Sequence, residues 1–263
     1  LAGEEPIPVL DGKIIVHSKY YQDSVDKLRG IFNKLDLVMD GEPVIRFVDP
    51  EVLRILTTEK AYCDYNPETS SIGYLTFLDR DGDGMITKDE AAQVTLLSNR
   101  PDKQSSIFAK TTIKIFNEFQ YFTGLAYFSS TFAGCNSLRE VTLPILEEMG
   151  NAVFADSSIE KIIIPEGYRK IGDQILSGAN QCRLIDFPST VESIGKNLLW
   201  GVKEITTIVC RATIPPTLNG SFGYNGIPVA IYVPDTVVDD YKSATGWSSQ
   251  AVKIQPLSTY VEP

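Results

Sequence analysis

Residues 79–90 carry acidic and glycine residues at the spacing that a bound calcium ion requires. Side-chain oxygens fall at positions 1, 3 and 5 of this stretch, a glycine at position 6 permits a sharp turn, and a glutamate at position 12 offers a bidentate carboxylate. Hard oxygen ligands of this kind suit Ca²⁺ and not a soft metal. The sequence therefore predicts a calcium site. The ligands that we expect are Asp79, Asp81, Asp83, the backbone carbonyl of Met85, Thr87 through a water molecule, and Glu90.

The same stretch has a simpler interpretation, a solvated acidic turn that caps the helix beginning near Thr87. The calcium interpretation is favoured because Gly84 and Glu90 both fall where the loop geometry demands them. The chain has one such loop, whereas sensor loops work in pairs, and the preceding segment 70–78 is too short for a full entering helix. We therefore expect a structural calcium site and not a switch that opens a groove.

No other pattern in the chain places catalytic groups together. The one histidine, His17, falls at the edge of an expected strand, and no serine or cysteine has an identifiable base partner. The glycine-rich stretch 219–226 lacks the lysine of a phosphate-binding loop. We therefore expect a protein that is not an enzyme. The cysteines are expected to be buried free thiols: Cys63, Cys135, Cys182 and Cys210.

Composition limits the partners. The chain of 263 residues has a formal net charge of −10, and residues 1–105 hold 19 acidic and 12 basic side chains, a net of −7. This acidity argues against a nucleic-acid partner. No apolar stretch of about 18 residues is present, so we expect no transmembrane segment. We recognise no signal peptide, and residues 1–6 are compatible with a mature or trimmed terminus, so composition does not decide between cytosol and exterior.

The elements around the acidic stretch read as a small mixed α/β region. Helical spacing of apolar residues and local caps predict two helices before it, and Thr87 begins a third. Alternation and turn residues predict the strands. In chain order we expect a hairpin within 6–17, a helix over 24–37, a strand over 44–47, a helix from Pro50, a loop over 62–73, a helix over 87–97 and a polar connection over 100–111.

A repeated unit fills residues 132–198 and organises the second part of the chain. An apolar residue followed by glycine recurs at Met149-Gly150, Ile171-Gly172 and Ile194-Gly195, so the period is 22–23 residues. A fixed period of this length is typical of a solenoid, in which stacked turns bury a face that one turn alone cannot bury. Each unit also holds a short strand that ends at proline, and its glycine is expected to allow the chain reversal. The turns open at Phe132, Phe154, Leu176 and Leu199, and the strand ends are Leu143-Pro144, Ile164-Pro165 and Phe187-Pro188.

The unit from Phe132 to Pro144, which reads Phe-Ala-Gly-Cys-Asn-Ser-Leu-Arg-Glu-Val-Thr-Leu-Pro, resembles the BspA-like leucine-rich repeats of Bacteroides cell-surface proteins. The next two units drift from this pattern, with Asp156-Ser157 and then Ala179–Cys182 in place of the Gly-Cys pair. The EF-hand-like loop before the repeats and the segment 115–124 resemble the same relatives. The resemblance implies secretion and attachment at the cell surface, on the outer membrane.

Aromatic residues gather on both sides of the repeats. Those between Phe116 and Phe132 could form a ligand platform, but we favour an apolar plug over the open end of the repeats. After the repeats, 205–209 and 229–233 are expected to be strands, and a helix is expected from Pro234 to about Ser243. This tail resembles the C-terminal ends of BspA-like proteins and is expected to cap the last turn.

The fold class that we predict is α/β: a small mixed N-terminal region over 1–105, then a short leucine-rich-repeat solenoid with caps over 106–263. The predicted function is a non-catalytic, monomeric binding or adhesion protein whose partner is a host or bacterial surface protein or a glycan. Two alternatives stay open, a carbohydrate-binding accessory protein of a surface glycan-utilisation system and a plain structural spacer. The candidate binding residues are Glu140, Thr142, Lys161 and Asp186 on the strands, and Phe222, Tyr224 and Trp247 as aromatic faces for sugar rings.

Overall fold

The computed structural model describes residues 42–261, apart from 104, 127, 203–206 and 224–227, together with short strands nearer the N-terminus. Those strands are β1 (Val9–Leu10), β2 (Lys13–Ile15) and β3 (Leu37–Met39), which form one sheet with β4 (Glu42–Pro43) in the order β1-β2-β3-β4. The antiparallel β1–β2 pair confirms the hairpin predicted within 6–17. The predicted helix over 24–37 lies outside the described residues, except for Leu37, which begins β3.

The helix predicted from Pro50 is confirmed as α2 (Pro50–Thr58). Proline occupies its first turn, and the Asp49 carboxylate accepts the backbone N–H of Glu51, because an N-cap side chain satisfies a donor that the helix leaves unpaired. The strand predicted over 44–47 is reduced to a single bridge between Val44 and Thr87, followed by a hydrogen bond from Ile45 N–H to the Ile86 carbonyl.

The loop predicted over 62–73 is wrong, because these residues form a β-hairpin. Strand β5 (Ala61–Tyr62) pairs with β8 (Leu75–Thr76), and β6 (Tyr65–Asn66) pairs with β7 (Ser71–Ile72). Tyrosine, isoleucine and leucine favour extended backbone, while the Asn-Pro sequence marks the turn and not the end of structure. The following helix α3 (Lys88–Gln93) is shorter than the predicted 87–97, because the backbone N–H groups of Thr95 and Leu96 donate to the carbonyl of Cys63 in the hairpin.

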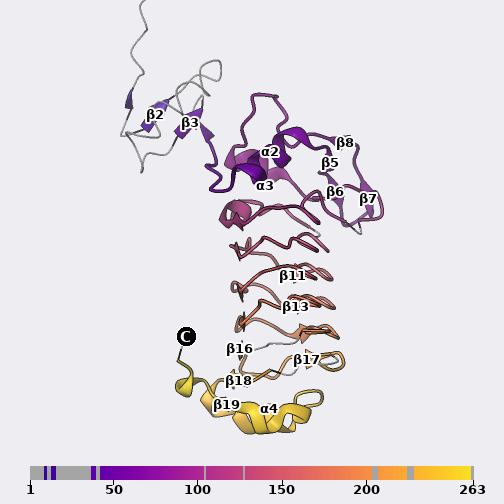
Figure 1. The fold of residues 1–263 in the computed structure, drawn as a ribbon, viewed down its shortest axis with the longest axis vertical. Coiled ribbons are helices and arrows are strands. Elements are labelled where there is room, and N and C mark those ends of the chain that lie inside the picture. The colour runs from indigo at the N-terminus through magenta and orange to yellow at the C-terminus, as the bar shows by residue number, and fades with distance from the viewer. Residues whose placement is uncertain are drawn as a thin grey trace, which may run out of the picture.

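From residue 115 onward the chain forms coils that stack along the long axis of the molecule (Figure 1). One parallel sheet runs down one side of the stack, in the order β12-β14-β16-β18-β19. Paired residues are 23 positions apart, as in Lys161 with Leu184 and Leu184 with Thr207, which matches the period of the repeat. The strands are β12 (Lys161–Ile163), β14 (Leu184–Phe187), β16 (Thr207–Cys210), β18 (Ala230–Val233) and β19 (Ile254–Pro256).

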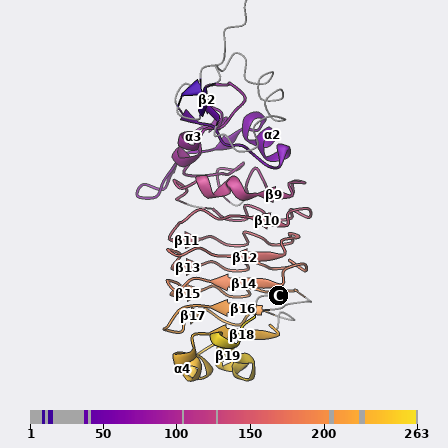
Figure 2. The same cartoon turned by 90° about the vertical axis from the view of Figure 1, so that its left-hand side faces the viewer.

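Above this sheet, β9 (Ile115–Phe116) pairs in parallel with β10 (Glu140–Val141), and the short helix η2 (Asn117–Tyr121) follows β9. No pairing between β10 and β12 occurs among the described strands, so the ladder is interrupted at this level. Figure 2 shows this sheet and the second ladder side by side along the stack.

The second ladder also runs parallel, in the order β11-β13-β15-β17. Gly150, Gly172 and Gly195 directly follow its first three strands, but they have no left-handed backbone. The reason for glycine is the close approach of neighbouring coils, since a Cβ on Gly172 would lie 2.4 Å from the Gly150 carbonyl oxygen. The glycines are therefore required for the close packing of neighbouring coils, and not for the chain reversal that we expected from the sequence. The strands are β11 (Glu148–Met149), β13 (Lys170–Ile171), β15 (Ser193–Ile194) and β17 (Thr217–Leu218).

Polar side chains next to these glycines hydrogen-bond from one coil to the next. Ser129 Oγ accepts the backbone N–H of Asn151, Asn151 Oδ1 accepts that of Asp173, and Asp173 Oδ1 accepts that of Lys196, at 2.8, 2.8 and 3.0 Å. These bonds satisfy backbone donors at the corner of each coil, where the strand ladder has ended.

A continuous apolar core runs through the stack from Ile45 to Ile254. The phenylalanines that the sequence places near residue 116 are buried, and the ring centroids of Phe116 and Phe119 are 5.3 Å apart. Phe132 stacks on Phe154 of the next coil with ring centroids 5.5 Å apart. The buried free cysteines are also confirmed, and burial raises the pKa of the Cys63 thiol to about 12. The predicted domain boundary at 105/106 stays a prediction.

The tail forms short helices below the last coils. The helix predicted from Pro234 is confirmed as η3 (Asp235–Val237) followed by α4 (Val238–Ser243). Next come η4 (Ser248–Lys253), strand β19 and η5 (Leu257–Thr259). The predicted mixed α/β class with parallel sheets is thus confirmed.

Candidate functional site

The predicted calcium loop brings its acidic side chains together. The carboxylates of Asp79, Asp81 and Asp83 each place an oxygen within 4.8 Å of the others. Asp79 is buried and shapes the loop, because Oδ1 accepts the backbone N–H of Gly82 at 2.8 Å and Oδ2 accepts that of Gly84 at 2.9 Å. Gly84 has φ +82°, a left-handed backbone that glycine adopts readily, in keeping with the sharp turn predicted at this position.

The exit from the loop is fixed by a capping box. Thr87 Oγ1 accepts the backbone N–H of Glu90, and Glu90 Oε2 accepts the backbone N–H of Thr87 at 2.9 Å. The other carboxylate oxygen of Glu90 accepts the N–H of Arg80 at 3.3 Å, so the residue at position 12 is turned back toward the start of the loop. Met85 is buried, and its N–H donates to Asp83 Oδ1 at 2.8 Å.

The electrostatics of the loop favour a cation. Burial and the neighbouring carboxylates of Asp81, Asp79 and Glu90 raise the pKa of Asp83 to about 6, although a hydrogen bond from the Met85 N–H opposes this rise. A divalent cation would relieve the repulsion between these groups. The donor set is made of hard oxygens gathered at one point, so the residues present fit Ca²⁺.

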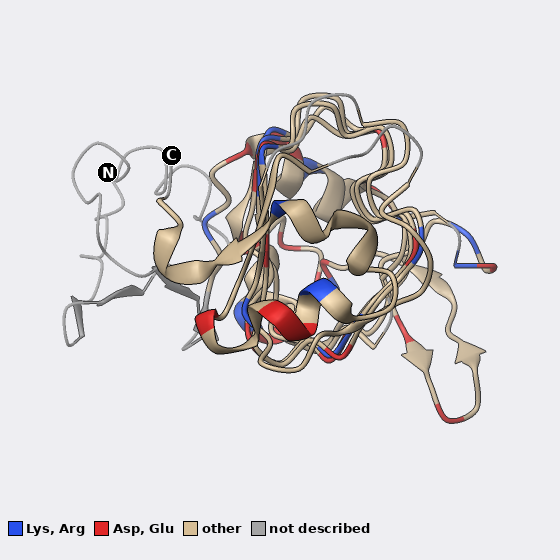
Figure 3. Ribbon diagram, turned by 90° about the horizontal axis from the view of Figure 1, so that it is seen from below, with Lys and Arg blue, Asp and Glu red and all other residues tan. Residues whose placement is uncertain are grey.

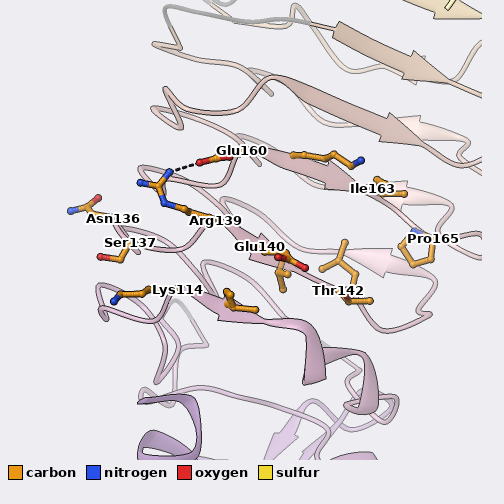
Figure 4. Close-up of a pocket in the computed structure, with 13 residues that line it drawn as sticks. Lys114, Asn136, Ser137, Arg139, Glu140, Thr142, Glu160, Ile163 and Pro165 are labelled. Carbon is orange, nitrogen blue, oxygen red and sulfur yellow. Dashed lines mark hydrogen bonds and ion pairs between the residues drawn. The ribbon is translucent and has the colours of Figure 1, made fainter. Parts of the chain in front are cut away.

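A groove lies on the outer face of the stack, across β9, β10 and β12 (Figure 4). Its volume is about 1030 Å³, and it lies where the ladder is interrupted between β10 and β12. The exposed side chains of Glu140, Thr142 and Lys161, which the sequence predicted as binding residues, line it. Ile115 of β9 and Ile163 of β12 line the groove as well. We call these five outward residues the open half of the outer face: Ile115, Glu140, Thr142, Lys161 and Ile163.

Side-chain contacts hold the polar groups of the groove in place. Asn117 Nδ2 donates to Glu140 Oε1 at 2.6 Å, and Thr142 Oγ1 donates to Asn117 Oδ1 at 2.9 Å. Arg139 forms an ion pair with Glu160 of the next coil, and Figure 4 shows the two side chains turned toward each other. Ile163 offers an apolar surface among these groups, since its side chain is 52% exposed.

The prediction that Asp186 is an exposed binding residue is wrong. Its position corresponds to that of Ile163 one coil above, but it is only 7% exposed. Arg211 donates two hydrogen bonds to its carboxylate, at 2.9 and 2.7 Å, and this pairing raises the pKa of Arg211. A carboxylate with so little exposure needs such a partner.

The tail packs against the same sheet further down. The segment after β19 turns back beside the sheet, and Tyr260 packs on Tyr232 of β18 with ring centroids 5.0 Å apart (Figure 1). Ser258 N–H donates to Asp235 Oδ1 at 2.9 Å and anchors the segment. We call the outward residues below the groove the covered half of the outer face: Leu184, Asp186, Thr207, Val209, Ala230 and Tyr232.

Two of the three aromatic faces predicted for sugar rings, Phe222 and Trp247, are not available. Phe222 is 3% exposed and Trp247 is fully buried, with the rings edge-to-face at 5.6 Å. Trp247 Nε1 donates to the Pro216 carbonyl at 2.8 Å, so this residue closes the core below the last coils. Tyr224 lies outside the described residues. Two of the three residues that motivated the carbohydrate alternative are therefore buried, and Tyr224 stays a prediction.

Sequence reasoning missed several groove residues: Lys114, Arg139, Glu160 and Ile163. The signal for Ile163 was present, because alternation along the run Ile162-Ile163-Ile164 must turn the middle isoleucine outward. The Arg139–Glu160 pair joins two coils, and only the repeat register could have brought these two residues together.

Parallel ladders with this period define a leucine-rich-repeat architecture. The family model described as "BspA type Leucine rich repeat region" matches residues 104–227 in six copies, which confirms the resemblance for the repeats and supports a BspA-like leucine-rich repeat protein. Proteins of this type are typically surface-associated, and their repeats suggest protein–protein interaction or adhesion. A comparison with the curated proteins finds no match. Among the described residues, no helix has the length and apolar character needed to cross a membrane.

Proposed function

We propose that the protein is a secreted or cell-surface binding module without catalytic activity, and that a host or bacterial surface protein docks in the groove of the open half. The repeats form a short solenoid whose two ends are capped, by the buried aromatics near Phe116 at one end and by Trp247 at the other. The observation that carries this proposal is the groove of about 1030 Å³ beside the exposed Ile163.

The groove has the chemistry of a protein-binding surface. Ile163 and Ile115 offer apolar contact, while Glu140 and Thr142 are already held by Asn117 and lose little side-chain entropy on binding. Interfaces of this kind concentrate their affinity in a few central side chains surrounded by polar groups. We expect Ile163 to be the central contact.

The test is a binding screen against purified extracellular-matrix and bacterial surface proteins by biolayer interferometry. Ile163→Asp should weaken any specific complex at least about tenfold, since a charge replaces an apolar contact. Val252→Asp, at a residue that is 93% exposed outside the groove, is the matched control and should bind like the parent. Equal binding by parent and Ile163→Asp would exclude the groove as the docking site.

We also propose that the acidic loop holds one structural Ca²⁺ ion, bound by the carboxylates of Asp79, Asp81, Asp83 and Glu90, with Met85 and Thr87 completing the set as predicted. The clustered carboxylates and the raised pKa of Asp83 support this proposal. Calcium should raise the melting temperature of the parent by mass action. The exposed variant Asp81→Asn should lose most of this response, whereas Asp239→Asn, an exposed acid in α4, should keep it.

The calcium response should depend on pH. Since the pKa of Asp83 in the folded protein is about 6, above its ordinary value of 3.8, the metal-free fold is penalised for ionising Asp83 at neutral pH and is relieved as the pH falls through 6. Calcium must displace this proton below pH 6, so its affinity should fall about tenfold for each pH unit there. Titrations at pH 7 and pH 5 measure the difference. A response that is the same at both values would contradict the involvement of Asp83.

A further inference from the structure

Charged residues beside the starts of the outer strands stand in a column. Arg139 N–H donates to the Lys114 carbonyl at 2.9 Å, and Glu160 N–H donates to the Arg139 carbonyl at 3.4 Å. One coil further, Arg183 N–H donates to the Glu160 carbonyl at 2.7 Å. These bonds place one exposed charged residue of each coil above that of the next. Figure 3, which looks along the stack, shows basic and acidic residues of several coils overlying one another.

The signs alternate along this column except at its top. Arg139, Glu160 and Arg183 follow one another as base, acid and base, but the residue above Arg139 is a second base, Lys114. The Lys114 ammonium has no hydrogen bond or ion pair with any residue that the structure describes. The Asp49 carboxylate accepts the backbone N–H of Lys114 instead, at 2.5 Å. Two like charges on adjacent coils repel each other, so a carboxylate from outside would be attracted by both.

The groove has a donor end and an apolar end (Figure 4). Groups that can donate hydrogen bonds to an anion gather at the donor end: Lys114, Asn136, Ser137 and Arg139. Ile163 and Pro165 lie at the apolar end. The carboxylate of Glu140, which Asn117 holds, lies between the two ends. An acidic group in the groove therefore finds its most favourable position at the donor end.

We propose that the groove binds an extended peptide segment of a partner protein, with an aspartate or glutamate four residues from a large apolar residue. This inference rests on the proposed function, because it names the chemistry of the segment that docks there. The carboxylate binds between Lys114 and Arg139, and the apolar side chain contacts Ile163. Arg139 can make both contacts, since a guanidinium has five N–H donors and the Glu160 ion pair leaves others available.

The length of the groove fits this spacing. Its lining residues on the upper coil run from Arg139 to Leu143, which is four residues and about 13 Å along extended backbone. Side chains four apart on an extended peptide share one face and are separated by the same length. The net charge of −10 opposes an acidic partner only weakly at a distance, because physiological salt screens charges beyond about 8 Å.

The experiment is a selection of phage-displayed random peptides of about twelve residues, long enough to span the groove, on the immobilised full chain. Enriched peptides should carry an acid four residues from a large apolar side chain. The same selection on Lys114→Glu should instead enrich peptides with a lysine or arginine in place of the acid, because the substitution reverses the charge at the donor end. No enrichment over the bare support, or enrichment of peptides without an acid on the parent, overturns the proposal.

Fluorescence anisotropy with a selected peptide then measures affinity. Lys114→Glu should weaken binding at least about tenfold, whereas Lys242→Glu, an exposed control in α4 at the other end of the stack, should bind like the parent. The peptide with lysine in place of its acid should bind Lys114→Glu more tightly than it binds the parent. Equal affinity of the selected peptide for the parent and Lys114→Glu overturns the proposal.

The same variants separate this inference from the proposed function. A surface protein whose binding falls in Ile163→Asp and in Lys114→Glu supports both. Loss of binding in Ile163→Asp alone keeps the groove as the docking site and overturns the acidic segment. A surface protein that binds both variants like the parent overturns both.

Discussion

The open and covered halves of the outer face are built from equivalent positions of the same repeat, yet their side chains differ in exposure. In the open half, Thr142 and Ile163 face solvent and line a groove. In the covered half, Asp186 and Val209 stand in register with Ile163 and are buried. The difference shows that the repeat register alone does not set the exposure of an outward position.

Residue types follow this division. The outward positions of β10 and β12 include glutamate and lysine, whereas those of β14, β16 and β18 include leucine, valine and alanine. The one acid in the covered half, Asp186, is neutralised by Arg211. The outer face of the lower strands is therefore more apolar and less exposed than that of β10 and β12, which approaches the pattern of a parallel sheet buried on both faces.

The comparison predicts its largest contrast between two lysine substitutions. Val209→Lys should destabilise the protein by about 3 kcal/mol or more, because it places a charge at a fully buried site where the neighbouring carboxylate of Asp186 is already paired with Arg211. Ile163 is the exposed residue at the equivalent position in the open half. Ile163→Lys should change the free energy of unfolding by less than about 0.5 kcal/mol. Urea denaturation followed by tryptophan fluorescence measures both. Similar losses in the two variants would mean that the halves do not differ in burial.

A smaller contrast is expected between two ion pairs. Asp186→Ala should cost about 2 kcal/mol, because it leaves Arg211 without the acceptor of its two hydrogen bonds in a site where the aspartate side chain is only 10% exposed. Arg139→Ala breaks the Glu160 pair in the open half, where both side chains are more than half exposed, and should cost less than about 1 kcal/mol. Thermal melting of the two variants checks the order.

The smallest effect concerns the tail. Tyr260→Ala removes the ring that packs on Tyr232, a loss of about 1 kcal/mol for an aromatic pair. The same variant should increase hydrogen exchange in β18 and leave β12 unchanged, because only the covered half depends on the tail. An equal increase in both strands would show that the tail stabilises the whole sheet and not one half.

The sequence was sufficient for features that depend on neighbouring residues. The cap of α2 and the turn at Gly84 each follow from residues within one short segment, and the period of the coils follows from a pattern that repeats along the chain. The sequence was insufficient to predict burial where distant segments of the chain meet. The burial of Asp186 depends on Arg211, 25 residues away, and that of Trp247 on the Pro216 carbonyl, 31 residues away. Phe222 was misread for the same reason, since an aromatic residue in a glycine-rich stretch suggests exposure until the packing partner is known.

The hydrogen bonds between coils have a consequence for a protein under tension. In both ladders, and in the side-chain series from Ser129 to Lys196, these bonds run along the axis of the stack and so lie parallel to a force that pulls its two ends apart. Such a force loads the bonds of one junction at a time, as in opening a zipper, instead of shearing many together. Each released coil would add 22–23 residues of extended chain, about 70–80 Å, so the molecule would lengthen in steps at low force.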